Sequence, residues 1–164
     1  VLSRDDALAA RLVAAKRCRQ ADYKLNLFPL SDLQAALVLA QWARLPAMTA
    51  RRQVLAARYR AYFAGHPRMS VVGSDDGVAS SDYRLVCRLK DGHGVTVDDL
   101  VERCAARGVA VRRPVATLLH TLRAARSCPV AERLHACTLS LPLYPALTDT
   151  QHAVVCATLA EALG

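Results

Sequence analysis

Four helix starts are marked in the sequence by a hydroxyl residue followed three positions later by an acidic or amide residue. In such a pair the hydroxyl accepts from an unpaired amide of the first turn, and the second side chain bonds back or stabilises the positive helix end. The pairs are Ser3 with Asp6, Ser31 with Gln34, Thr96 with Asp99, and Thr148 with Gln151. They predict helices at both ends of the chain and in its middle, near residues 4–18, 31–45, 97–107 and after Thr148.

A proline is expected to divide the second of these helices. Pro46 has no amide hydrogen to donate and its ring crowds the preceding turn. We therefore expect a break or kink there, with helical stretches over residues 31–45 and 47–64 rather than one straight rod. Gly65 and Pro67 are placed to end the second stretch.

Beyond about residue 70 the apolar residues alternate with polar ones. This period of two predicts half-buried strands near residues 82–90, 109–113 and 138–142, the last an edge strand because Pro142 cannot donate to a ladder. A short helix is expected to begin at Pro129. The fold class is therefore α+β, with a helical stem over residues 1–66 and a small two-layer lobe over residues 67–164. The lobe would hold about three to four strands covered by helices.

Composition sets the broad class of protein. The 164 residues are 53% hydrophobic and 22% charged, enough to bury a core, and no apolar stretch reaches membrane-spanning length. No leader-like segment is visible, so we expect a cytoplasmic protein whose six cysteines are reduced. The chain begins at Val1 without an initiator methionine, and we expect it to be a piece of something longer.

The net charge of +8 favours an anionic partner, but it does not choose one. The cations are scattered, which is also typical of an ordinary solvated surface. One alternative that this leaves open is a non-catalytic basic module that binds nucleic acid or another anion through Arg84, Arg88 and Lys90 on one strand face. A non-catalytic partner subunit is a further alternative.

A search for catalytic residues finds two unusual stretches and no metal site. The five histidines show no metal-ligand spacing, and none of the three lysines lies in a sequence that predicts a reactive amine. Asn26 sits in an apolar loop before a capped helix, where an amide suits a phosphate, although a packed connector is the simpler interpretation. Arg112 and Arg113 end a predicted strand and are suited to clamp a carboxylate or phosphate, or form a solvated strand end.

Four motifs in order along the chain resemble those of the DegT–StrS family of sugar aminotransferases. The first two are S-D-L-Q-A-A-L-V-L-A-Q over residues 31–41 and R-R-Q-V-L-A-A-R-Y over residues 51–59. The others are G-V-A-V-R-R-P-V over residues 108–115 and L-S-L-P-L-Y-P-A-L-T-D over residues 139–149. The resemblance runs over the whole chain but covers only the C-terminal half of such an enzyme.

The resemblance implies a pyridoxal 5'-phosphate (PLP) enzyme of fold type I. It would transfer an amino group from an amino acid such as glutamate to a keto-sugar nucleotide. The family's large catalytic domain, with the lysine that binds PLP covalently, is absent, so this chain supplies no catalytic residue and is expected to be inactive alone. By resemblance Asn26 would reach the PLP phosphate of the neighbouring subunit, and Arg112, Arg113 and His120 would lie near the substrate.

The resemblance also implies a homodimer of the complete enzyme, or pairing with a separate N-terminal half, and it disfavours nucleic acid as a partner. The sequence adds an independent hint. Residues 25–30 form a loop too apolar for water, and one face of the helix at residues 33–40 is apolar as well. We expect both to be interface surface, so the isolated chain should self-associate.

Overall fold

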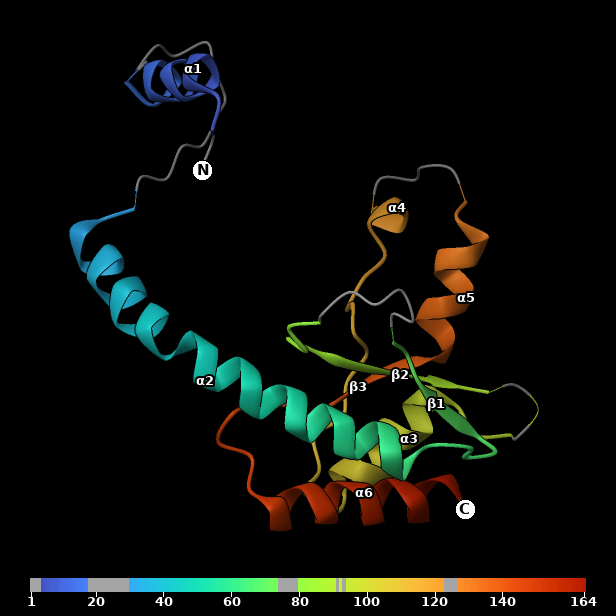
Figure 1. Ribbon diagram of the computed structural model, residues 1–164. Coiled ribbons are helices and arrows are strands. Elements are labelled where there is room, and N and C mark those ends of the chain that lie inside the picture. Colours follow the sequence, from blue (N-terminus) through green and yellow to red (C-terminus); the bar gives the residue numbers. More distant parts are fainter. Residues whose placement is uncertain (1–3, 18–29, 74–79, 91, 93, 123–126) are drawn as a thin grey trace. The chain divides into compact units, whose positions relative to one another are not determined.

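The computed structural model describes residues 4–17, 30–73, 80–90, 92, 94–122 and 127–164, and side chains in these ranges except 15–17 (Figure 1). Two compact units divide the chain, Val1–Arg44 and Leu45–Gly164. The elements in order are α1 (Asp6–Arg17), α2 (Asp32–Tyr62), β1 (Met69–Val71), β2 (Leu85–Leu89), α3 (Val97–Ala105), α4 (Leu119–Leu122), α5 (Pro129–Cys137), β3 (Thr138–Leu141) and α6 (Asp149–Leu163). The predicted α+β class is confirmed.

Three of the four predicted helix caps are present. Ser31, Thr96 and Thr148 each exchange hydrogen bonds with the residue three positions on, at 2.8–3.2 Å. The first helix differs, because α1 begins at Asp6 and the carboxylate of Asp5 accepts from the amide of Leu8 at 3.0 Å. Ser3 lies outside the described residues. The Pro129 helix also begins where the sequence predicts.

The expected break of the helix at Pro46 was wrong, and a kink there, the other outcome expected, stays a prediction. The helix α2 continues through the proline as one element of 31 residues. Pro46 costs the helix one amide donor, but both flanks are long enough to hold their own hydrogen bonds, so one missing bond does not end it.

The sheet is three-stranded and antiparallel, in the order β1-β2-β3. Ser70 pairs with Arg88, and Val86 pairs with Ser140. The sequence did not predict β1, which is only three residues long. The predicted strand at 109–113 is reduced to a single bridge between Arg112 and Ser140, because Pro114 lacks the amide needed to extend the pairing.

One core lies within Leu45–Gly164, on the inner face of the sheet. Alternate residues of β2 are buried there, as the period of two predicts, while Arg88 is exposed. The C-terminal part of α2 lies on this side of the sheet together with α3 and α6, whereas α4 and α5 lie on the other side (Figure 1). The core includes Tyr59, Phe63, Met69, Leu85, Cys87, Leu89, Leu100, Leu139, Leu141, Cys156 and Leu159.

Large apolar side chains of the first unit are exposed. The spacing of Leu8, Leu12 and Val13 along α1 predicts that they turn inward, but they are 38–50% exposed. Leu33, Leu37 and Trp42 of α2 are 59–72% exposed. Helix α1 and the first part of α2 therefore bury little apolar surface in the described part of the chain, whereas Leu55 and Tyr59 near the other end of α2 are fully buried.

The described cysteines form no disulfide. Cys87, Cys104 and Cys156 are buried, as expected of thiols that pack as small apolar groups, whereas Cys128 is exposed. Burial raises the pKa of Cys87 to about 12 and that of Cys156 to about 11, so both are unreactive thiols at neutral pH. Among the described residues, no helix is long and apolar enough to cross a bilayer.

Candidate functional site

The segment after the Arg112 bridge is held in place from several directions. Its first residue exchanges backbone hydrogen bonds with Ser140, at 3.3 Å and 2.6 Å. Further along, Arg84 donates to the carbonyl of Pro114, and the ring Nε2 of His135 lies 3.0 Å from the carbonyl oxygen of Val115. The segment of residues 112–120 is therefore fixed against β3, α5 and the residue that precedes β2, although it has no strand or helix of its own until α4 begins at Leu119.

Arg113 directs its guanidinium into the domain. Its Nη2 donates to Asp98 Oδ1 of α3 at 2.9 Å, and its Nη1 donates to the backbone carbonyl of His135 in α5. The side chain is only 22% exposed. These contacts occupy both terminal nitrogens, so Arg113 joins the segment to two helices.

His120 is held by α5 as well, through the carboxylate of Glu132. Its Nε2 lies 2.8 Å from Glu132 Oε1, an oxygen that also accepts from the amide of Cys128 at 3.0 Å and the hydroxyl of Ser127 at 3.2 Å. The Cys128 amide and then His120 hold the pKa of Glu132 below its usual value. The carboxylate is therefore charged at neutral pH and orders both the start of α5 and His120.

Arg112 is different from its neighbour. Its side chain is exposed and makes no hydrogen bond or ion pair with the part of the chain that the structure describes. Ser140 lies directly across the bridge, and its hydroxyl oxygen is buried with no hydrogen-bond partner among the described residues. Side chains opposite one another across a bridge share one face of the sheet. The residue with the free guanidinium therefore lies across the bridge from the residue with the unused hydroxyl.

Arg113 and His120 therefore both bond to α5, at His135 and Glu132, which are three residues apart. Arg112 has no such bond to the described residues. Asn26 lies outside the described residues. Asp98, Glu132 and His135 were not predicted from the sequence as site residues. The sequence does hold one signal for two of them: Glu132 and His135 stand at positions i and i+3 of a short helix, and so lie on one face of it.

Two of the motifs found in the sequence, around residues 51–59 and 139–149, bond to one another. The Tyr59 hydroxyl donates to the carbonyl of Pro142 at 3.1 Å, and Arg51 Nη2 donates to the carbonyl of Leu147 at 2.8 Å. Asp149 accepts from Arg51 and Arg58, and these arginines, Arg51 first, lower its carboxyl pKa. The motif around residues 51–59 thus fastens the loop after β3 to α2.

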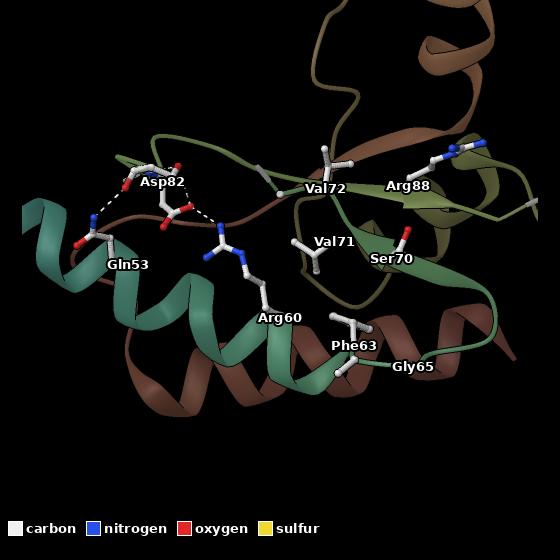
Figure 2. Close-up of a pocket in the computed structure, with 12 residues that line it drawn as sticks. Gln53, Arg60, Phe63, Gly65, Ser70, Val71, Val72, Asp82 and Arg88 are labelled. Atoms are coloured by element: carbon white, nitrogen blue, oxygen red, sulfur yellow. Dashed lines mark hydrogen bonds and ion pairs between the residues drawn. The ribbon is translucent and has the colours of Figure 1, made fainter. Parts of the chain in front are cut away.

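A polar hollow of about 800 Å³ lies between the end of α2, β1 and the turn before β2 (Figure 2). Arg60 reaches Asp82 at 2.6 Å, and Gln53 donates to the carbonyl of Ser80 at 2.8 Å. Asp82 is 6% exposed and has a φ of 43°, a left-handed conformation that aspartate tolerates better than most residues. Both bonds serve to hold the turn against α2.

No lysine side chain that the structure describes forms a covalent cofactor site. Lys90 is exposed and donates to the carbonyl of His66 at 2.9 Å, so its amine is not enclosed as a cofactor-binding lysine requires. The side chains of Lys16 and Lys24 lie outside the description. The described His, Cys, Asp and Glu residues also include no group of three that could hold a metal.

The basic strand face considered as an alternative is largely occupied. Arg84 is bonded to Pro114 and Lys90 to His66. Of the three cations proposed for that face, Arg88 is left without a bonded partner among the described residues. This arrangement does not favour a nucleic-acid surface.

Comparison with known proteins identifies a family. Residues 4–160 match the model of the DegT/DnrJ/EryC1/StrS aminotransferase family. The chain is similar to the aminotransferase TlmJ from Streptoalloteichus hindustanus, with 28% identity and a TM-score of 0.80 over 98% of this chain and 46% of that one.

Two further solved structures share the fold. DesI, solved in the presence of its TDP-sugar product, has 24% identity and a TM-score of 0.82 over 99% of this chain and 44% of its own. Spr1654 from Streptococcus pneumoniae, in a PLP form, has 23% identity and a TM-score of 0.70 over 81% of this chain and 36% of its own. The chain thus spans less than half the length of these relatives. It belongs to the DegT/DnrJ/EryC1/StrS aminotransferase family.

Proposed function

We propose that this chain is the C-terminal portion of a PLP-dependent aminotransferase that aminates a keto-sugar nucleotide with an amino-acid donor. The family match over residues 4–160 carries the proposal. DesI with its TDP-sugar product and Spr1654 with PLP support the substrate class and the cofactor. PLP, when bound, supplies an electron sink for the amino transfer.

The part that this chain plays is to bind and orient the substrate. Arg112, Arg113 and His120 would lie near it, with an arginine pairing a carboxylate or phosphate of the ligand. Asn26 would contact the PLP phosphate of the neighbouring subunit. The lysine that binds PLP covalently would come from a large domain joined to, or paired with, this chain.

The complete enzyme would be a cytoplasmic homodimer, or this chain would pair with a separate N-terminal half. Residues 1–66 would then form the stem that links to the large domain, and residues 67–164 the small domain. The apolar side chains exposed on α2, with Leu33 at 72% and Trp42 at 67%, support this proposal, because a helix face of this kind is normally covered by a partner.

Complementation tests this function. The chain would be co-expressed with an N-terminal half of a family member that carries the PLP lysine, then supplied with PLP, glutamate and a keto-sugar nucleotide. The expected product is an amino-sugar nucleotide, measured by mass spectrometry, from the pair and from neither half alone. The control pair carries the N-terminal half with its PLP lysine replaced by alanine. Turnover by this control, or a purified pair that binds PLP but aminates no keto-sugar nucleotide, would contradict the proposal.

A further inference from the structure

The two adjacent arginines of the 112–120 segment have different surroundings. Arg113 uses Nη1 and Nη2 inside the domain, on the His135 carbonyl and the Asp98 carboxylate. The side chain of Arg112 is exposed, and no described residue bonds to it. A guanidinium whose terminal nitrogens are already committed is poorly placed to form a bidentate pair with a ligand, whereas a free one is well placed.

The structure assigns separate tasks to these residues: Arg112 meets the anionic group of the substrate, and Arg113 is a positioning residue that keeps Arg112 in place. This inference rests on the proposed function for the identity of the ligand. Asp98 positions Arg113, and Glu132 positions His120 in the same way.

The contacts explain how positioning would work. The segment has little regular structure of its own, so its backbone would otherwise sample many conformations at an entropic cost to binding. Ties to α3 and α5 remove that freedom before a ligand arrives. The single bridge then fixes the backbone of Arg112 opposite Ser140, and with it the position from which the free guanidinium extends.

Chemical footprinting of this chain tests the assignment without any activity. Phenylglyoxal modifies accessible arginine guanidinium groups, and tandem mass spectrometry separates the two neighbouring positions. Arg112 should react like an arginine in a short peptide, and Arg113 roughly tenfold more slowly, because bonds to a charged group must first open. In Asp98→Asn the Arg113 rate should rise several-fold. Glu161→Gln, which removes the surface pair with Arg107, is the matched control and should leave both rates unchanged.

Hydrogen exchange supplies the second measurement on this chain. Glu132→Gln should speed amide exchange within residues 114–122 and leave exchange in α6 unchanged. Equal reactivity of Arg112 and Arg113 in the unaltered chain, or no effect of Asp98→Asn on Arg113, would overturn the assignment. That failure would leave the aminotransferase proposal standing, since neither experiment involves turnover.

The assembled enzyme distinguishes positioning from mere structural support. Arg112→Gln should raise KM for the keto-sugar nucleotide about tenfold, with a smaller effect on kcat, since it removes a pair to the ligand. Arg113→Gln should also raise KM. Arg113→Lys keeps the positive charge and can still reach Asp98, so its KM should return most of the way to that of the unaltered enzyme. If Arg113→Gln raises KM while Arg112→Gln does not, the tasks are reversed and the assignment is wrong.

Discussion

The Tyr59 hydroxyl donates to the carbonyl oxygen of Pro142 at 3.1 Å, and so joins the last turn of α2 to the loop after β3. Tyr59 is fully buried, and its ring packs against His152 of α6 with centroids 4.0 Å apart and the ring planes inclined at 44°. One side chain therefore connects three parts of the core. Burial raises the pKa of Tyr59, so the hydroxyl keeps its proton and remains a donor across the physiological range.

Tyr59→Phe should lower the free energy of unfolding by about 1–2 kcal/mol, because the Pro142 carbonyl loses its donor while the ring still packs. Urea unfolding followed by circular dichroism measures the change. Tyr62→Phe is the matched control on the same helix, since Tyr62 is 49% exposed, and it should be nearly neutral. Equal effects of the two variants would show that the Pro142 bond contributes nothing.

Asp82→Ala should destabilise the Leu45–Gly164 unit by roughly 1–3 kcal/mol, since it removes the carboxylate that Arg60 binds and places alanine at a φ of 43°. Asp82→Asn should cost clearly less, because asparagine tolerates this conformation and keeps an acceptor oxygen. The midpoint of thermal unfolding compares the two. An alanine variant as stable as the asparagine variant would mean that the left-handed turn is not under strain.

Stability should fall as the pH drops from about 7 towards 5. Burial first, then the charge of Arg58, lowers the pKa of His152 below its ordinary 6.5. Below that ordinary value the unfolded chain binds a proton that the folded chain resists, so the neutral imidazole stabilises the fold above about 6.5 and less as pH falls. Desolvation lowers the pKa of His66 as well, in the same window.

His152→Gln should therefore reduce the loss of stability between pH 7 and pH 5, even if it lowers stability at pH 7. Denaturant titrations at a series of pH values measure this slope. If His152→Gln leaves the dependence of the free energy of unfolding on pH unchanged, the loss of stability in acid does not come from His152.

Self-association should depend on the exposed face of α2. Leu37→Ser with Trp42→Ser should weaken it, because these side chains are 59% and 67% exposed and bury apolar area only against a partner. Sedimentation velocity over a range of concentrations gives the association constant. Tyr83→Ser, at a residue 77% exposed in the other unit, is the control. An unaltered chain that remains monomeric at high concentration would contradict the interface.

Local signals in the sequence predicted much of this fold. Three hydroxyl caps and the proline start of α5 depend on neighbours within four residues, so they can be read without knowing the tertiary structure. The strand β1 could not be predicted in this way. Its three residues gain their pairing from β2, sixteen or more residues further along the chain.

The candidate site was predicted in outline only. Arg112 and Arg113 look equivalent in the sequence. Of the two guanidinium groups, only that of Arg113 is bonded to described residues of the domain, because Asp98 of α3 and His135 of α5 lie beside it. The motif residues Arg51 and Tyr59 were recognisable, but their partners at Leu147 and Pro142 are more than 80 residues away. Long-range contacts of this kind leave no local pattern in the sequence.

Borohydride trapping tests the central claim most directly, namely that this chain is part of an aminotransferase whose PLP lysine lies outside it. The chain and a lysine-bearing N-terminal half would be incubated together with PLP, reduced, digested and searched for pyridoxyl-lysine by mass spectrometry. The account predicts a stoichiometric adduct on the N-terminal half and none on Lys16, Lys24 or Lys90, the only lysines of this chain. A stoichiometric adduct on any of those three would contradict it.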